Sequence, residues 1–202
     1  MITKLNIKAL EKKLGKTVTY NSISVGVDVA EKLTGICILR SDKEFIYIED
    51  KQLIETSAKE DHFSRADHFT ASLEKFKQTL NKYKMNKILV IERCFFGQNV
   101  ETLIHLAHFG IITYIILKKE FDAYYYWGAT TARSIIGFNQ RRQEANGTLK
   151  PTIISRGKNK GQTKKIDCKS LVHDYLKTDF NIVIPQKDEA DAFVLALAGL
   201  LK

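Results

Sequence analysis

The sequence predicts an α/β domain in which five strands form a sheet and helices flank it. Short runs rich in β-branched residues alternate with longer segments whose apolar residues recur every three or four positions. One run, "KILVIE" (87–92), has an unbroken apolar centre, which is typical of a central strand. A chain of 202 residues with 44% apolar residues can bury one full core. We therefore expect one domain over 23–202, preceded by a basic lead-in over 1–22 that contains a short helix.

The first three strands are expected close together in the chain. They are "SISVGVDVA" (22–30), "LTGICILRS" (33–41) and "EFIYIED" (44–50). The gaps between them are short, and the pair Ser41-Asp42 is a turn signal, which indicates a meander. After the strand at 87–92, "DAYYYW" (122–127) is expected to be the fifth strand.

Five segments are predicted to be helical. Residues 59–83 form an amphipathic pattern, with apolar side chains at Phe63, Ala66, Phe69, Leu73, Phe76 and Leu80. Residues 98–117 are largely apolar, and 129–136 form a short helix. Helices at about 164–177 and 188–201 complete the domain.

Charge is concentrated in the segment before these last helices. The chain carries 32 Lys and Arg against 23 Asp and Glu, a net charge of +9, which favours a polyanionic partner such as nucleic acid. The stretch 139–164 is polar and Gly-rich, and we expect a long exposed loop or hairpin there. The alternative is a protein that is basic without any such partner.

Three isolated cysteines, Cys37, Cys94 and Cys168, form no CxxC pair, which argues against disulfides and structural zinc. We expect a soluble protein in a reducing compartment, the cytoplasm, or the host-cell cytoplasm if the source is viral. The longest apolar stretch, 103–117, is short for a membrane span and contains two histidines, so no membrane partner is expected.

Four acids occupy positions where a carboxylate is costly. Asp28 lies inside the first strand, and Glu92 ends the central strand. Asp188 and Asp191 lie in the first turns of the final helix, where Asp191 shares a face with the apolar residues. Three of them have a structural explanation, a helix cap for Asp188 and ion pairs at strand ends for Asp28 and Glu92, but Asp191 is poorly explained in this way.

Taken together, these acids indicate a metal site. If the final helix crosses the sheet near the strand ends, the four carboxylates converge, and such a set suits Mg²⁺ or Mn²⁺. Two such ions can clamp a scissile phosphate. Beside a basic loop, this arrangement indicates phosphodiester hydrolysis.

Four segments resemble the RuvC-type Holliday junction resolvases of the RNase H-like superfamily. They are "VGVDVAEKLTGICIL", "VIERCFFG", "GQTKKIDCKSLVHDYL" and "QKDEADAFVLALAG", and the resemblance runs from about 23 to 200 in the family's order. It implies an RNase H-like fold with a mixed sheet. The family usually has Pro-Gly after the first Asp, whereas this chain has Val29-Ala30, which suggests a divergent phage or viral member.

The resemblance also implies roles for individual residues. Asp28, Glu92, Asp188 and Asp191 would be the metal ligands, and Lys165, with Lys164 as its rival, would face the scissile phosphate. Phe95 matches an aromatic that wedges into the junction centre, a role that Phe96 could share; the alternative for Phe95 is a core position. The basic residues expected to contact DNA are Arg133, Arg141, Arg142, Arg156, Lys158, Lys160 and Lys164.

The function implied is cleavage of branched DNA, chiefly Holliday junctions, with two Mg²⁺ ions per site and with Mn²⁺ able to substitute. The apolar segment 98–117 would then be a homodimer surface. Two alternatives remain at this point. One is an RNase H-like nuclease acting on RNA–DNA hybrids or other DNA structures, and the other is a non-catalytic DNA-binding protein of the same fold.

Overall fold

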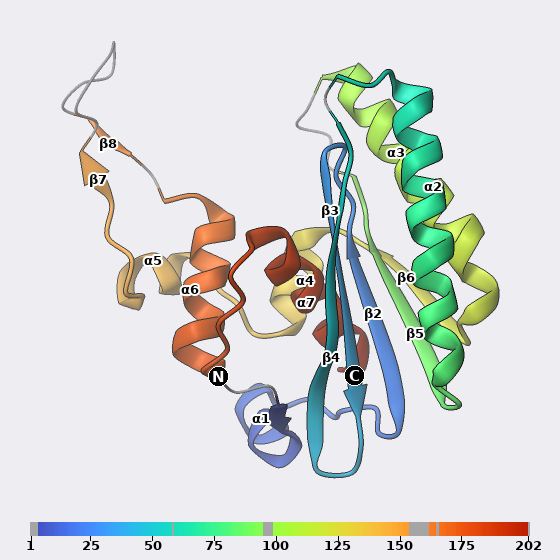
Figure 1. Ribbon diagram of the computed structural model, residues 1–202. Helices are drawn as coiled ribbons and strands as arrows, with labels where there is room; N and C mark the ends of the chain where they lie inside the picture. Colours follow the sequence, from blue (N-terminus) through green and yellow to red (C-terminus); the bar gives the residue numbers. More distant parts are fainter. Residues whose placement is uncertain (1–3, 58, 95–98, 154–161, 165, 202) are drawn as a thin grey trace.

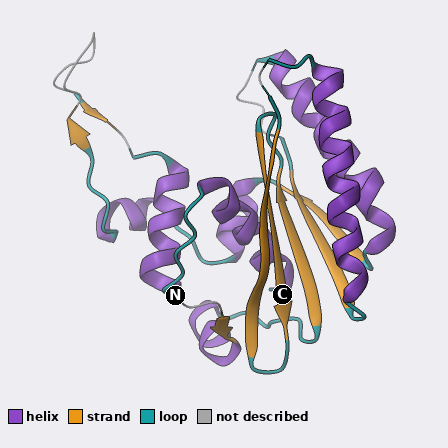
Figure 2. Cartoon of the chain, in the orientation of Figure 1, coloured by secondary structure: helices purple, strands orange, loops and turns teal. Residues whose placement is uncertain are grey.

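The computed structural model describes residues 4–57, 59–94, 99–153, 162–164 and 166–201. A mixed six-stranded sheet forms its centre, in the order β1-β4-β3-β2-β5-β6. Two long helices cover one face of the sheet, and the C-terminal helix with several shorter helices covers the other (Figures 1 and 2). The predicted α/β class is confirmed.

Five of the six strands are those the sequence predicts. β2 (Ser22–Asp28), β3 (Leu33–Ser41) and β4 (Phe45–Glu55) form the antiparallel meander. β5 (Asn86–Glu92) pairs in parallel with β2, and β6 (Ala123–Trp127) pairs in parallel with β5. These parallel pairings make the sheet mixed. They also bring the carboxyl ends of the central strands β2 and β5 side by side at the same end of the sheet.

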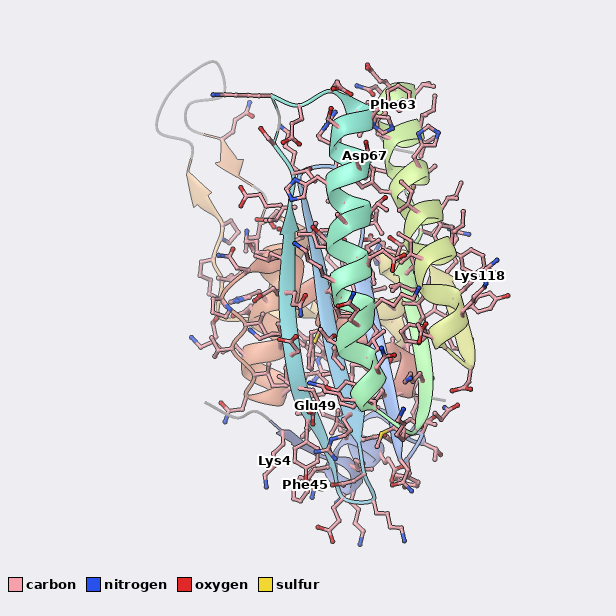
Figure 3. The ribbon with its side chains drawn as sticks, turned by 45° about the vertical axis from the view of Figure 1, so that its right-hand side comes forward. Lys4, Phe45, Glu49, Phe63, Asp67 and Lys118 are labelled. Carbon is pink, nitrogen blue, oxygen red and sulfur yellow. The ribbon has the colours of Figure 1, made fainter. Side chains whose placement is uncertain are left out.

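The sixth strand, β1 (Lys4–Asn6), comes from the lead-in and was not predicted. It pairs antiparallel with β4, and the Lys4 ammonium lies 4.1 Å from the centre of the Phe45 ring (Figure 3). Three residues are too few to show a strand periodicity, so only the pairing reveals this strand. The helix predicted in the lead-in is α1 (Ile7–Leu14), which buries Ile7 and Leu10.

The long helices of one face are α2 (His62–Thr79) and α3 (Val100–Leu117), followed by the short turns η1 (Leu80–Lys82) and η2 (Lys118–Glu120). Phe69 of α2 packs against Phe109 of α3, with ring centres 4.7 Å apart. Phe63, expected in the apolar stripe of α2, is 80% exposed on the first turn (Figure 3), because that turn extends beyond the sheet.

The other face is covered by α7 (Lys187–Leu200), which packs against β2 and β3. Glycines permit the close approach: a Cβ at Gly26 would lie 2.1 Å from the Ala192 carbonyl oxygen, and one at Gly35 would lie 2.3 Å from that of Asp188. The glycine at 35 therefore lets the first turn of α7 lie directly on the sheet. α4 (Ala129–Ile135) and α6 (Cys168–Phe180) flank α7 (Figure 1).

The segment 139–164, expected as a long loop or hairpin, ends in a hairpin-like ribbon and begins with a helix that was not expected. It contains α5 (Gln140–Asn146) and a two-stranded ribbon of β7 (Thr152–Ile153) and β8 (Thr163–Lys164). Buried Asp174 of α6 accepts hydrogen bonds from the Gln143 side chain, at 2.7 Å, and from the Thr148 amide, at 2.9 Å. This carboxylate anchors α5 and the turn after it to α6.

The helix predicted at 164–177 begins four residues later, at Cys168. The Asp167 carboxylate accepts the Ser170 amide at 2.8 Å and so caps this later start. The shift matters for the site, because it places Lys169 in the first turn of α6.

Candidate active site

The four predicted acids are positioned by three elements that meet at one edge of the sheet. Asp28 is the last residue of β2 and Glu92 the last of β5. Because Val27 and Ile91 are paired in the parallel ladder, these two strand ends lie side by side. α7 crosses the same edge with its first turns, which bring Asp188 and Asp191 to the strand ends.

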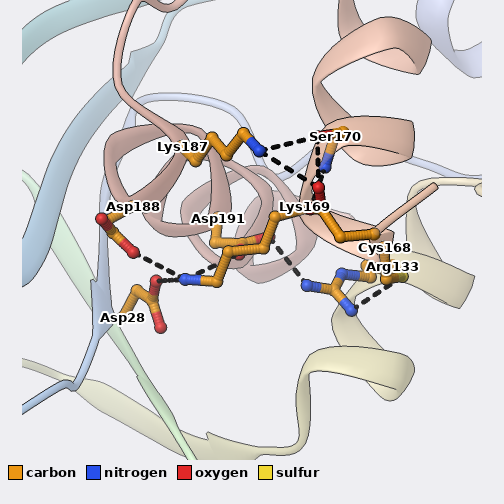
Figure 4. A network of polar contacts seen from close by, with 9 residues as sticks. Asp28, Arg133, Cys168, Lys169, Ser170, Lys187, Asp188 and Asp191 are labelled. Carbon is orange, nitrogen blue, oxygen red and sulfur yellow. Dashed lines mark hydrogen bonds and ion pairs between the residues drawn. The ribbon is translucent and has the colours of Figure 1, made fainter. Parts of the chain in front are cut away.

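A lysine that was not predicted to be a site residue holds three of these acids together. The Lys169 ammonium lies 2.6 Å from Asp188 Oδ1, 3.0 Å from Asp28 Oδ2 and 3.3 Å from Asp191 Oδ2 (Figure 4). The Asp28 and Asp191 side chains are only 4% and 7% exposed, while that of Lys169 is 39% exposed. The ammonium therefore reaches from the rim of the site into a buried set of carboxylates.

Arg133 of α4 supplies a second cation. Its Nη2 donates to Asp191 Oδ1 at 3.0 Å and its Nη1 to Cys168 Sγ at 3.3 Å (Figure 4). Its side chain is 12% exposed, and the guanidinium, which the sequence predicts to contact DNA, faces a site carboxylate. The reason is the packing of α4 on α7, which buries this face of the short helix.

Burial and mutual repulsion perturb the acids. Burial, then a hydrogen bond with Asp28 and the charges of Asp28 and Asp191, raise the pKa of Glu92 to about 10. Burial also raises the pKa of Asp191, although the Arg133 guanidinium opposes the shift. Burial opposes the charge of Lys169, but the carboxylates of Asp28 and Asp191 outweigh it and raise the pKa of this amine. The protein without metal thus holds more carboxylates than Lys169 and Arg133 neutralise, and the raised pKa of Glu92 favours its protonated form.

This donor set fits a hard divalent cation. All four candidate ligands are carboxylates, and Mg²⁺ prefers oxygen ligands. Within the described residues, no three acidic, histidine or cysteine side chains are arranged as a preformed metal cage. Three of the acids surround the Lys169 ammonium, which supplies the positive charge that a metal ion would otherwise supply there.

A cavity of about 380 Å³ opens beside the acids. Asp28, Glu92 and Lys169 form one side of it, and the loop between β2 and β3, the residues that follow β5 and the first turns of α3 form the rest. Substrate could therefore reach the carboxylates from this cavity.

A family model described as crossover junction endodeoxyribonuclease RuvC matches residues 24–154, more than half of the chain. This chain belongs to the RuvC family. The match includes Asp28, Glu92 and Arg133, but it ends before α6 and α7. The places of Lys169, Asp188 and Asp191 in the site therefore come from the tertiary structure.

Two solved structures of Thermus thermophilus RuvC are similar to this chain. One, in complex with a Holliday junction substrate, matches with a TM-score of 0.58 and 12% identity, covering 87% of this chain and 91% of that one. The other matches with a TM-score of 0.57 and 14% identity, covering 89% and 98%. Likeness at such low identity shows the fold, and the predicted RNase H-like class is confirmed. Comparison with curated proteins gives no match.

The remaining predicted residues of this RuvC-family chain fall into two groups. Arg141 and Arg142 are exposed on α5, and Lys164 belongs to β8. The others lie outside the described residues: Phe95, Phe96, Arg156, Lys158, Lys160 and Lys165.

Lys169 is the functional residue that sequence reasoning missed. The segment "GQTKKIDCKSLVHDYL" predicts a helix starting near 164, and the family resemblance assigns the lysine of this segment to Lys165 or Lys164. Asp167 followed by Ser170 is an N-cap signal, and it would have placed Lys169 in the first turn. No sequence signal shows that this first turn faces the acids.

Proposed function

We propose that this protein is a divalent-metal-dependent endonuclease that cleaves branched DNA, with Holliday junctions as its main substrate. The observation that carries the proposal is the meeting of Asp28, Asp188 and Asp191 around one ammonium, with Glu92 beside them, in a chain of the RuvC family. The similar Thermus thermophilus RuvC binds a Holliday junction, which supports this substrate.

Asp28, Glu92, Asp188 and Asp191 would hold the metal, two Mg²⁺ ions per site, with Mn²⁺ able to substitute. When bound, such ions lower the pKa of an attacking water and stabilise the oxygen that leaves the phosphate. Burial raises the pKa of Glu92, so metal binding to its carboxylate would compete with protonation and should weaken as the pH falls.

The protein's own cations would act at defined atoms. The Arg133 guanidinium fixes the Asp191 carboxylate through Oδ1 and leaves Oδ2 directed at Lys169. The Lys169 ammonium, partly exposed at the cavity, would be free to bind a phosphate oxygen when the acids bind metal ions. Lys169 thereby takes the role that the resemblance assigned to Lys165, whose own position is not described.

DNA contacts beyond the site would come from the basic segment. Arg141 and Arg142 on α5 are exposed, and α5 is anchored to α6, the helix that carries Lys169. Contacts of Phe95, Phe96 and the basic residues at 156–160 with DNA stay predictions from the family resemblance.

We also propose that α3 forms a homodimer surface. Ile111 and Ile115 are 55% and 58% exposed, and a second cavity of about 370 Å³, free of charged lining residues, lies between α3 and β6. By length and composition alone, α3 with the turn that follows it, Val100–Glu120, could cross a membrane, since an 18-residue window in it has a mean hydropathy of 1.6. Its packing along α2 through Phe109, however, favours a protein partner for the exposed side.

The test is cleavage of three synthetic substrates: a four-way junction, a linear duplex and an RNA–DNA hybrid, each with Mg²⁺ and with EDTA. The proposal expects Mg²⁺-dependent cleavage of the junction in preference to the others, and its loss in Asp28→Asn. Preferred cleavage of the hybrid would favour a different RNase H-like activity. Junction binding without cleavage under any divalent metal would indicate a non-catalytic DNA-binding protein.

A further inference from the structure

Two exposed cations line the cavity beside the acids and have no place in the site described so far. Lys32 lies in the loop between β2 and β3, four residues after Asp28, and Arg93 directly follows Glu92. Because β2 and β5 are parallel neighbours, both residues emerge at the edge of the sheet that carries the acids.

The charges of these two cations are not used within the described part of the chain. Lys169 and Arg133 are both paired with site carboxylates. Lys32 and Arg93 make no ion pair and no side-chain hydrogen bond with the residues that the structure describes. Most such cations on a protein are simply solvated, but these two face a cavity that also contains Asp28 and Glu92.

The backbone around Lys32 is held firmly. The Thr56 amide donates to the Lys32 carbonyl at 3.0 Å, and the Thr56 hydroxyl donates to the Glu31 carbonyl at 2.6 Å. The Glu31 carboxylate pairs with Arg65 of α2 and contacts His105 Nδ1 of α3 at 3.0 Å. The loop is thus tied to both long helices, and Lys32 is presented from a preorganised position.

Arg93 is anchored on the opposite side of the acids. Its amide donates to the Trp127 carbonyl at 2.7 Å, which extends the β5–β6 pairing by one residue. Its guanidinium lies against Gly128, where an added Cβ would be 3.9 Å from Nη2. In the strand order β3-β2-β5-β6, Lys32 therefore lies on the β3 side of Asp28 and Glu92, and Arg93 extends toward β6.

We propose that Lys32 and Arg93 bind backbone phosphates on either side of the scissile phosphate. One DNA strand would then run along this edge of the sheet, with the acids between its two anchored phosphates. The inference rests on the proposed nuclease function and adds to it the path of the strand across the site and two residues that position it.

The experiment compares the parent protein with Lys32→Gln, Arg93→Gln and the double variant. The matched control is Lys12→Gln, since Lys12 is exposed on α1, whose first residue Ile7 donates to the Glu44 carbonyl in the turn after Ser41, at the opposite end of β2. Junction affinity is measured in EDTA over a range of salt concentrations, and KM and kcat are measured in Mg²⁺. Melting curves establish that each variant is folded.

Each single variant should raise Kd and KM about tenfold, the usual effect of losing a charge-assisted hydrogen bond. Each should also reduce the log–log salt slope by roughly 0.7 to 0.9, while kcat stays near that of the parent. Lys32→Arg and Arg93→Lys, which keep the charge, should restore most of the affinity. Lys12→Gln should leave KM unchanged.

If the parent cleaves junctions and both single variants keep its KM and salt slope, the inference is wrong and the proposed function stands. A fall in kcat without a change in KM would also overturn it, because the residues would then act in the chemistry. If the parent cleaves no DNA, the proposed function fails, and the affinities in EDTA still decide whether these two residues bind DNA.

Discussion

Replacing Lys169 by methionine should destabilise the metal-free protein and make its stability more responsive to Mg²⁺. The substitution leaves Asp28 and Asp191, 4% and 7% exposed, without the ammonium that lies 3.0 Å and 3.3 Å away. Breaking a fully buried ion pair costs about 3–5 kcal/mol, whereas an exposed pair contributes about 0–1 kcal/mol. Because the lysine side chain is 39% exposed, solvent screens part of the effect. We expect a loss of about 2–3 kcal/mol.

The assay is thermal unfolding in EDTA and in saturating Mg²⁺. In a chain of this size each kcal/mol corresponds to about 2–4 °C, so Lys169→Met should melt about 4–12 °C below the parent in EDTA. Mg²⁺ at about a hundred times its Kd adds about 2.7 kcal/mol to the stability of any protein that binds it only when folded. The gain should be larger in Lys169→Met than in the parent, because no ammonium competes for the carboxylates.

Lys177→Met is the control, since Lys177 is exposed on the same helix α6 and should change neither value. An unchanged Tm for Lys169→Met in EDTA would refute the view that the ammonium neutralises the acids. A smaller Mg²⁺ response than that of the parent would show that Lys169 supports metal binding and does not compete with it.

Four further predictions follow from the same structure and the family resemblance. Glu92→Gln should abolish most cleavage but shift the Tm in EDTA by less than about 4 °C, because burial raises the pKa of Glu92 to about 10 and the glutamine replaces a group that is already neutral. A loss of Tm as large as that of Lys169→Met would mean that the Glu92 carboxylate is ionised. Ile111→Glu should convert the proposed dimer to a monomer in analytical ultracentrifugation, while Phe63→Glu, on the exposed first turn of α2, should not. Burial and then the charges of neighbouring histidines lower the pKa of His62 below 6.5, so the unfolded chain binds more protons at this residue than the folded one. Stability should therefore fall as the pH drops below about 6.5, and His62→Gln should make that fall shallower in melting curves at pH 7.5 and about 5.5. Phe95→Ala should slow junction cleavage about ten- to hundredfold with duplex affinity unchanged, and a collapse in Tm would instead assign Phe95 to the core.

The sequence by itself determined the α/β class, the five longer strands and the helices other than α5, because their apolar runs and periodicities follow from which faces are buried. It also singled out Asp28, Glu92, Asp188 and Asp191, since carboxylates in apolar strands and on an apolar helix face are costly without a function. Strand β1 and helix α5 were missed, because three residues show no periodicity and because a polar, Gly-rich stretch resembles a loop.

Only the tertiary structure decided which cations belong to the site. Lys169 is 141 residues from Asp28 in the chain, and Arg133 is 58 residues from Asp191. Whether such pairs meet depends on how α4 and α6 pack against α7, and on the glycines at 26 and 35 that let α7 lie close to the sheet. Local patterns report which residues are buried, whereas the partner of a buried charge is chosen by contacts between distant segments, which no local pattern encodes.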